Sequence, residues 1–155
     1  MRSRRWTELA ILLTVIAVAA WLLLPAGAPA VDSIELGMTR AEVEETIREP
    51  FTVAEEGGYT YCRSLETSVR LRDGRVDQVD GTTLDYRGGR LTGAATTEEQ
   101  LLAILGPPDQ VRRLRTAASP HQRPVEESLY QYRHLRLLAW LDRHRSQARF
   151  RLFSL

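Results

Sequence analysis

The 155-residue sequence has one cysteine, Cys62, and no lysine, so all 21 of its basic residues are arginine. A single cysteine excludes an intrachain disulfide framework and a four-cysteine zinc site. The sequence also has no glycine-rich phosphate-binding loop, no Gly-x-Ser-x-Gly elbow and no His-Glu-x-x-His motif. With 43% hydrophobic and 26% charged residues, it is neither a disordered tail nor a multi-span membrane protein. We therefore expect a small globular protein that is not an enzyme and has no cofactor.

One long apolar run stands near the N-terminus. Three arginines among the first five residues precede Leu9–Leu24, which contains no charge. At about 1.5 Å per residue, Trp6–Leu24 spans about 28 Å, close to the ~30 Å hydrocarbon core of a bilayer. This pattern predicts a transmembrane signal anchor, with the arginines on the cytoplasmic side and the C-terminal part outside the cytoplasm. The alternative is a signal peptide cleaved near Ala30, which gives a periplasmic or secreted protein.

The charges of the remaining chain are unevenly distributed. Residues 31–92 carry 8 arginines and 13 acidic residues, whereas residues 93–155 carry 10 arginines and 6 acidic residues. Opposite net charges favour the packing of two segments against each other or against a partner. The alternative is that these charges only cover solvated faces and carry no function.

The two segments share an order of sequence signals. Thr39-Arg-Ala-Glu42 and Thr97-Glu-Glu-Gln100 each match a capping box, and a proline follows each short predicted helix, at Pro50 and Pro108. Each helix is followed by a Tyr-x-Tyr strand, Tyr59–Tyr61 and Tyr130–Tyr132.

A strand hairpin follows each Tyr-x-Tyr strand, the first with an Asp73-Gly74 turn. Gly81–Thr92 predicts a further pair of short strands between the segments, and Arg115–Glu127 predicts a long loop in the second. The predicted fold class is α+β. Behind the segment 1–30 we expect two tandem units, 31–92 and 93–155, of short helices packed on small antiparallel sheets.

Two short motifs resemble a known family. The stretch Ile34-Glu-Leu-Gly37-Met38-Thr39-Arg-Ala-Glu-Val43 and the helix end Leu105-Gly106-Pro107-Pro108 resemble SmpA/OmlA-type domains, which are similar in fold to tandem β-lactamase-inhibitor-protein-like units. The resemblance implies helices on one face of an antiparallel sheet, with the other face free for binding. Family members are envelope lipoproteins that assist β-barrel assembly, or secreted inhibitors. This sequence lacks the lipid-bearing cysteine, and Arg48-Glu49 replaces the Leu-Gly of the pattern.

Arginines and aromatic residues of the last predicted strands are the candidate partner-binding residues. If the arginines share the solvent side, they form a basic patch for an acidic protein or anionic headgroups. Export argues against nucleic acid as a partner. The aromatic residues belong either to an interface or to the core. The set comprises Arg133, Arg143, Arg145, Arg149, Arg151, Tyr130, Tyr132 and Trp140.

Other reactive side chains give no catalytic or metal site. A cysteine nucleophile needs a nearby histidine, and the three histidines are distant from Cys62 in sequence, so we expect Cys62 to be a small buried residue. His134, Asp142 and His144 do not converge as metal ligands need to.

These observations predict a non-enzymatic protein-binding module of the cell envelope, tethered to the membrane through Trp6–Leu24, with an unidentified envelope protein as partner. The alternative is a secreted proteinaceous enzyme inhibitor of the β-lactamase-inhibitor-like type that inserts loops such as Arg115–Glu127 into its target.

Overall fold

The structure is a computed structural model that describes residues 27–116, 125–142, 145 and 147–154. Its elements, in chain order, are β1 (Ala30–Val31), α2 (Arg40–Thr46), β2 (Thr52–Glu56), β3 (Tyr59–Arg63), β4 (Ser68–Arg72), β5 (Arg75–Gly81), β6 (Thr83–Tyr86), β7 (Gly89–Thr92), α3 (Glu98–Leu105), β8 (Gln110–Thr116), β9 (Val125–Tyr132), the 3-10 helix η1 (Arg133–Leu135), β10 (Leu137–Asp142) and β11 (Gln147–Phe153).

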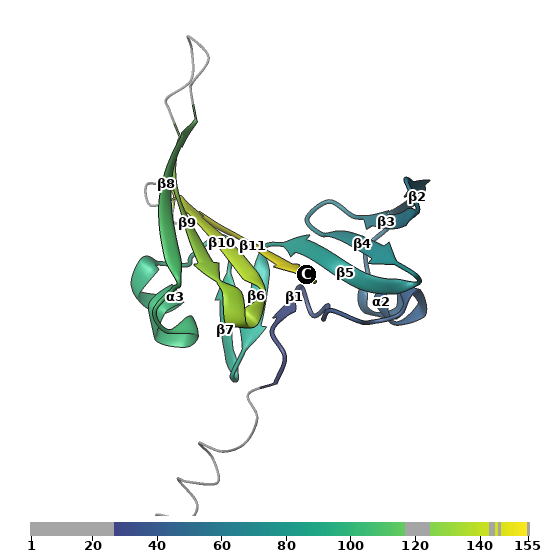
Figure 1. Cartoon of the computed structure of the whole chain (residues 1–155), viewed down its shortest axis with the longest axis horizontal. Coiled ribbons are helices and arrows are strands. Elements are labelled where there is room, and N and C mark those ends of the chain that lie inside the picture. The colour runs from purple at the N-terminus through teal and green to yellow at the C-terminus, as the bar shows by residue number, and fades with distance from the viewer. Residues whose placement is uncertain (1–26, 117–124, 143–144, 146, 155) are drawn as a thin grey trace, which may run out of the picture.

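A helix followed by four antiparallel strands occurs twice along the chain. The strands form one eight-stranded sheet in the order β2-β3-β4-β5-β11-β10-β9-β8 (Figure 1). Each half is a meander, in which neighbouring strands follow one another in sequence, and the fourth strands of the two halves, β5 and β11, pair antiparallel at the junction. The strands β1, β6 and β7 form a separate three-stranded sheet.

The junction between the halves combines backbone pairing with opposite charges. Gly81 lies opposite Phe150, and Asp80 lies opposite Arg151. The guanidinium of Arg151 donates to the carboxylate of Asp80 across the junction. This ion pair joins the acidic segment to the basic one.

The predicted α+β class, with two small separate sheets, is wrong. Strands account for 52% of the structure and helices for 16%, so the fold is mostly β. The two α-helices of the described residues have 7 and 8 residues, and each covers only part of one shared sheet. The two sheets are joined because each meander would otherwise end in an open edge strand. Since the last strand of a half would otherwise leave its N–H and C=O groups unpaired, β5 and β11 satisfy each other and merge the two sheets.

The two helices begin where the sequence predicts. Thr39 and Thr97 are the N-caps, and both capping boxes are complete. The helix ends differ, because α2 ends at Ile47 in extended backbone, whereas α3 ends at Gly106 with φ 76° and ψ −166°. The φ of Gly106 is positive, as expected for a helix stop, but its ψ lies in a region that only glycine adopts readily.

Tight turns fix the register of the hairpins. The Asp73-Gly74 turn between β4 and β5 is confirmed, with both residues at positive φ. The pair of short strands predicted within Gly81–Thr92 is also confirmed as β6 and β7, joined by Arg87 and Gly88 at positive φ. Such two-residue turns match the right-handed twist of the strands that they join.

The two faces of the eight-stranded sheet have different surroundings. Figure 1 shows α2, α3 and the three-stranded sheet together on one side, where Val43, Leu101 and Leu84 join the inward side chains of the strands in one core. No described helix or strand covers the opposite side, which we name the open face. Its side chains alternate with the core residues and include Tyr59, Tyr61, Arg63, Arg70, Arg72, Gln78, Asp80, Glu127, Leu129, Gln131, Leu138, Trp140, Arg149, Arg151 and Phe153.

The prediction of a membrane anchor is corrected here. No helix that the structure describes is long and apolar enough to cross a bilayer. No described helix therefore supports the predicted transmembrane helix and signal anchor, or the single-pass cell-membrane location derived from them. The segment Trp6–Leu24, on which the prediction depended, lies outside the described residues.

The predicted loop Arg115–Glu127 is shorter than expected. Strand β8 continues to Thr116 and β9 begins at Val125, with Arg115 opposite Glu126. The remaining residues, 117–124, lie outside the described residues.

Candidate functional site

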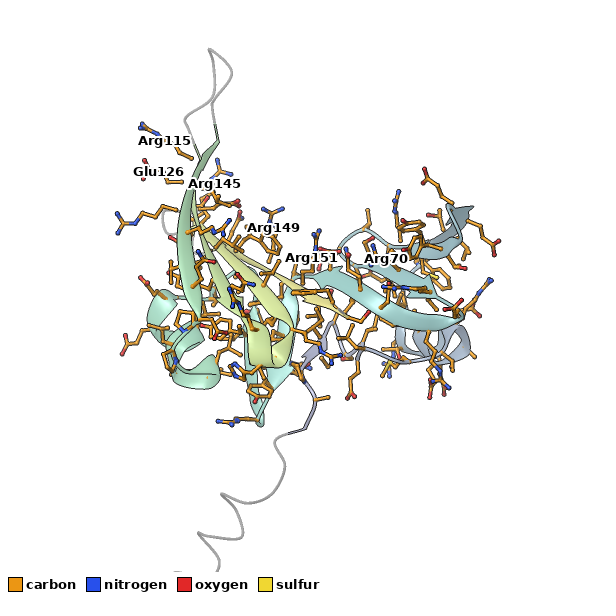
Figure 2. The ribbon with its side chains drawn as sticks, in the orientation of Figure 1. Arg70, Arg115, Glu126, Arg145, Arg149 and Arg151 are labelled. Atoms are coloured by element: carbon orange, nitrogen blue, oxygen red, sulfur yellow. The ribbon has the colours of Figure 1, made fainter. Side chains whose placement is uncertain are left out.

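Three of the predicted site residues lie together on the open face. Trp140 of β10 is directly opposite Arg149 of β11, and Arg151 follows two residues later on the same strand face. The guanidinium carbons of Arg149 and Arg151 lie 5.8 Å and 5.4 Å from the centroid of the Trp140 ring. Cations at this distance are attracted by the negative face of an indole. We name these three residues the Trp140 cluster (Arg149 and Arg151 are labelled in Figure 2).

Carboxylates hold both arginines of the Trp140 cluster. Arg149 donates to both oxygens of Glu127 at 3.0 Å and 3.2 Å, and Arg151 donates to Asp80. The side chains of Arg149 and Arg151 remain 63% and 40% exposed. A carboxylate thus orients each guanidinium group, and the net charge of the cluster together with Glu127 and Asp80 is close to zero rather than strongly positive.

The predicted tyrosines lie on the opposite face. Tyr130 is 1% exposed and Tyr132 is fully buried, so both belong to the core and not to an interface. The hydroxyl of Tyr130 donates to the carboxylate of Glu98 in α3 at 2.6 Å. Burial raises the pKa of Tyr132 to about 12, and the charge of the nearby Tyr130 makes a smaller contribution in the same direction. The Tyr132 hydroxyl has no hydrogen-bond partner among the described residues.

The remaining predicted arginines do not complete one basic patch. Arg133 lies in η1, which precedes β10, whereas Arg145 lies in the turn after it, so the two are at opposite ends of that strand. Arg145 approaches Asp142 at 3.9 Å and is 64% exposed. Arg143 lies outside the described residues. The structure thus brings together only the arginines of the Trp140 cluster.

A second group of arginines and aromatic residues occupies the first half of the open face. Arg70 and Arg72 of β4 lie over the ring of Tyr59, with guanidinium carbons 4.8 Å and 5.8 Å from its centroid. Arg63 lies 5.3 Å from the centroid of Tyr61. We name these five residues the Tyr59 cluster. Sequence reasoning missed it, although Arg70 and Arg72 alternate with the buried Val69 and Leu71 and so had to face solvent.

Asp77 organises the Tyr59 cluster from beneath. It lies where the β4–β5 register shifts, and it is only 5% exposed. Its carboxylate accepts hydrogen bonds from Arg70 at 2.8 Å and 2.9 Å and from Arg72 at 2.9 Å and 2.7 Å. Burial alone would raise the pKa of Asp77, but these bonds outweigh burial and lower it. The site therefore keeps a charged carboxylate that orients both guanidinium groups.

A small hollow lies beside the Trp140 cluster at the junction of the two halves. Its volume is about 150 Å³, enough for one side chain of a partner. Glu66, in the turn after β3, accepts a hydrogen bond from the Thr82 hydroxyl at 3.3 Å at the rim. The lining consists of Glu66, Asp80, Gly81, Thr82, Trp140, Arg149, Phe150 and Arg151.

A larger hollow of about 490 Å³ borders the end of α2 and the turn around Asp32. The Asp32 carboxylate accepts hydrogen bonds from the Thr67 hydroxyl at 2.7 Å and from the backbone N–H of Thr83 at 2.8 Å. These bonds tie the turn to β6 and to the turn before β4. The carboxylate of Asp32 is thus occupied in holding the fold.

Cys62 is fully buried on the core side of β3. Burial raises the pKa of its thiol, which disfavours the thiolate that a nucleophile needs. The described part of the chain contains no group of three or more His, Cys, Asp or Glu residues placed to hold a metal. His134 approaches Asp109 at 4.0 Å at an exposed site, and His144 lies outside the described residues.

The comparisons with known proteins add no identification. No protein-family model, no curated protein and no solved structure matches this chain. The resemblance to SmpA/OmlA-type domains remains a prediction, and the site must be interpreted from its own geometry.

Proposed function

We propose that this protein is a non-enzymatic protein-binding module whose binding surface is the open face of the eight-stranded sheet. The observation that carries the proposal is the pair of arginine–aromatic clusters, around Tyr59 and around Trp140, on the one sheet face that no described element covers. Tyrosine, tryptophan and arginine are the residues most enriched at the energetic centres of protein interfaces.

The carboxylates that bind the arginines of both clusters support the same function. Asp77, Asp80 and Glu127 hold the arginines in place before any partner arrives. A side chain that is already ordered loses less entropy on binding, so such a surface retains more of its contact energy. Because the guanidinium groups are neutralised nearby, we expect hydrogen bonding and stacking, rather than net charge, to dominate recognition.

The hollow at the junction gives this surface a pocket near its middle. Interface anchors are side chains that enter desolvated pockets near the centre of the contact. The volume of about 150 Å³ and the indole wall of Trp140 suit one apolar or aromatic side chain of a partner protein.

The test is site-specific photo-crosslinking in the cells that produce the protein. One version of the full chain carries the crosslinker at Leu129 on the open face, and the matched version carries it at Leu102, an exposed leucine of α3. We expect one recurrent protein to be captured from Leu129 and not from Leu102. Adding Trp140→Ala or Tyr59→Ala should lower the capture about tenfold or more, as for an interface anchor.

Any of three results would overturn the proposal. The first is capture that is equal from both positions, since it would show proximity without a specific face. The second is capture from Leu129 that Trp140→Ala and Tyr59→Ala leave unchanged while circular dichroism shows both variants folded. Capture from Leu102 alone would place the binding surface on the helix side.

A further inference from the structure

The eight-stranded sheet has two edge strands with opposite charges. Strand β2 carries Glu55 and Glu56, and strand β8 carries Arg112, Arg113 and Arg115. All five side chains are exposed. Among the described residues, β2 pairs only with β3 and β8 only with β9, so each presents one unpaired backbone edge. We name them the acidic edge (β2) and the basic edge (β8).

Three of these charges have no ionic partner within the described chain. The side chains of Glu56 and Arg113 make no hydrogen bond or ion pair there, and Arg112 reaches only the amide oxygen of Gln110 at 3.4 Å. Glu55 lies within electrostatic reach of Arg40 in α2, which Glu44 already binds. Arg115 approaches Glu126 at 3.7 Å, with both side chains more than half exposed. By contrast, carboxylates hold Arg70, Arg72, Arg149 and Arg151 on the open face.

From this contrast we propose that a second copy of this chain binds edge to edge, the acidic edge of one copy pairing antiparallel with the basic edge of the next. The direction of the strands permits it. All neighbours in the sheet are antiparallel and there are eight strands, so β2 and β8 run in opposite directions. A second copy placed in line, with its open face on the same side, therefore brings β8 antiparallel to β2.

The register of such a pair also matches. Arg112 and Glu56 both point to the open face, because their neighbours in the sheet are Leu129 and Tyr59. Arg113 points to the other face.

Glu55 points to that same other face, opposite Thr60. Placing Arg112 opposite Glu56 therefore also places Arg113 opposite Glu55 on the correct face. A shift by two residues in either direction leaves at most one such pair, so the charges select one register.

Like edges are a poor match. Pairing β8 with β8 sets arginines against arginines, and pairing β2 with β2 sets glutamates against glutamates, which destabilises a sheet. Charged residues on edge strands normally keep sheets apart. Here the two signs lie on different edges, so the same charges that block like pairing favour unlike pairing. Since each copy then offers one edge of each kind, association is head-to-tail and open-ended unless curvature closes a ring.

The test uses two charge-reversed versions of the full chain, Glu55→Arg/Glu56→Arg and Arg112→Glu/Arg113→Glu. Sedimentation velocity over a range of concentrations gives the average mass at low and at high ionic strength. We expect the unmodified chain to associate more strongly as concentration rises and less strongly as salt is added. In each reversed variant the two edges carry net charges of the same sign, although Arg115 stays on β8 in the second, so association should weaken about tenfold or more.

Mixing the two reversed variants is the decisive step. One variant then has two basic edges and the other two acidic edges, so an equimolar mixture should associate again, although neither variant does so alone. The control is Glu45→Arg/Glu49→Arg, which makes the same change of charge on α2 and in the segment after it. It should behave as the unmodified chain does.

The remaining outcomes overturn the proposal. An unmodified chain that stays monomeric at every concentration shows that the edge charges only keep copies apart. Association that both reversed variants retain points to another surface, because every other part of the chain is unchanged in them. A mixture that fails to associate, with both variants folded by circular dichroism, excludes the proposed register.

Discussion

The same Tyr-x-Tyr motif points in opposite directions in the two halves of the sheet. In β3, Tyr59 and Tyr61 face solvent on the open face, where arginines lie over their rings. In β9, the second strand of the other half, Tyr130 and Tyr132 fill the core. Since successive side chains of a strand alternate between faces, a change of one residue in register is enough to exchange surface and core.

The two helices show why the halves differ. Helix α3 buries Leu101 and Leu105, and Glu98 at its start accepts a hydrogen bond from Tyr130. Helix α2 buries only Val43, above a β3 strand whose buried residue is the small Cys62. The core of the second half thus holds two tyrosines, whereas the first half places its tyrosines outside. The comparison teaches that a strand motif acquires its role from what packs on the sheet.

Truncation of the tyrosines should produce the largest difference in stability between the two halves. Tyr130→Ala should lower the free energy of unfolding by about 3–5 kcal/mol, because it removes a fully buried ring and leaves a cavity. Tyr59→Ala, its counterpart on the open face, should cost about 1 kcal/mol or less, since it removes stacking with two arginines but no core volume. Urea denaturation of both variants measures the difference. Equal losses would contradict the assignment of the two motifs to opposite faces.

The helix ends provide the next test. Gly106→Ala should cost about 1–3 kcal/mol, because the backbone of this residue lies at φ 76° and ψ −166°, where an added Cβ is strained although no atom lies within 4 Å of it. The matched control is Gly27→Ala, where the space is equally open and φ is not in the positive range. Thermal unfolding should show a lower midpoint only for Gly106→Ala. A small effect there would mean that α3 ends without needing glycine.

Asp77 should make the stability of the fold sensitive to acid. The pKa of Asp77 in the folded state is below its usual 3.8, so its charge stabilises the fold above that pH and this contribution is lost as the pH falls further. Asp77→Asn should cost about 1–3 kcal/mol at neutral pH and should weaken the loss of stability between about pH 5 and about pH 2.

Asp80→Asn is the matched variant at the junction of the halves. Both partners of the Asp80–Arg151 pair are at least 30% exposed, so its removal should cost about 1 kcal/mol or less. Unfolding curves recorded at several pH values test both variants. An unchanged acid limb in Asp77→Asn would show that another carboxylate carries the pH dependence.

The two tyrosine hydroxyls of β9 should have different effects on stability, and the smallest change is expected at Tyr132. Tyr132→Phe should be neutral or stabilise by up to about 1 kcal/mol, because the buried Tyr132 hydroxyl has no hydrogen-bond partner in the described chain. Tyr130→Phe should instead cost about 1–3 kcal/mol, since it leaves the Glu98 carboxylate without this donor. If the two hydroxyls have the stated surroundings, denaturation should show a lower free energy of unfolding for Tyr130→Phe and an unchanged or higher one for Tyr132→Phe. A loss of stability in Tyr132→Phe would indicate a partner for that hydroxyl.

Local signals in the sequence predicted local structure well. The capping boxes at Thr39 and Thr97 are present, and the Asp73-Gly74 turn forms the expected hairpin. These features depend on residues three or fewer positions apart, so a single sequence contains them. The fold class was wrong because the pairing of β5 with β11 depends on strands far apart in sequence, which no local pattern encodes.

The candidate site was predicted only in part, for the same reason. Alternation along β11 correctly put Arg149 and Arg151 on one solvent-facing side. Cross-strand neighbours decide which carboxylates neutralise these arginines. They also decide that Trp140, and not Tyr130, lies beside them. The Tyr59 cluster was missed because Arg70 and Arg72 lie on the following strand, and only the β3–β4 register places them over the Tyr59 ring.

The junction of the halves also sets the order in which the strands of the sheet can pair during synthesis. Arg151 and Asp80 are 71 positions apart, so during synthesis β5 leaves the ribosome well before its partner β11 exists. Until then β5 carries an open edge beside the already paired β4, and an open edge can template the wrong strand. Closing so long a loop also slows folding, since distant contacts form only after their entropic cost has been met. The pairing of β5 with β11 is therefore the folding step at which the nascent chain is most prone to misassembly. This step also depends most strongly on β11.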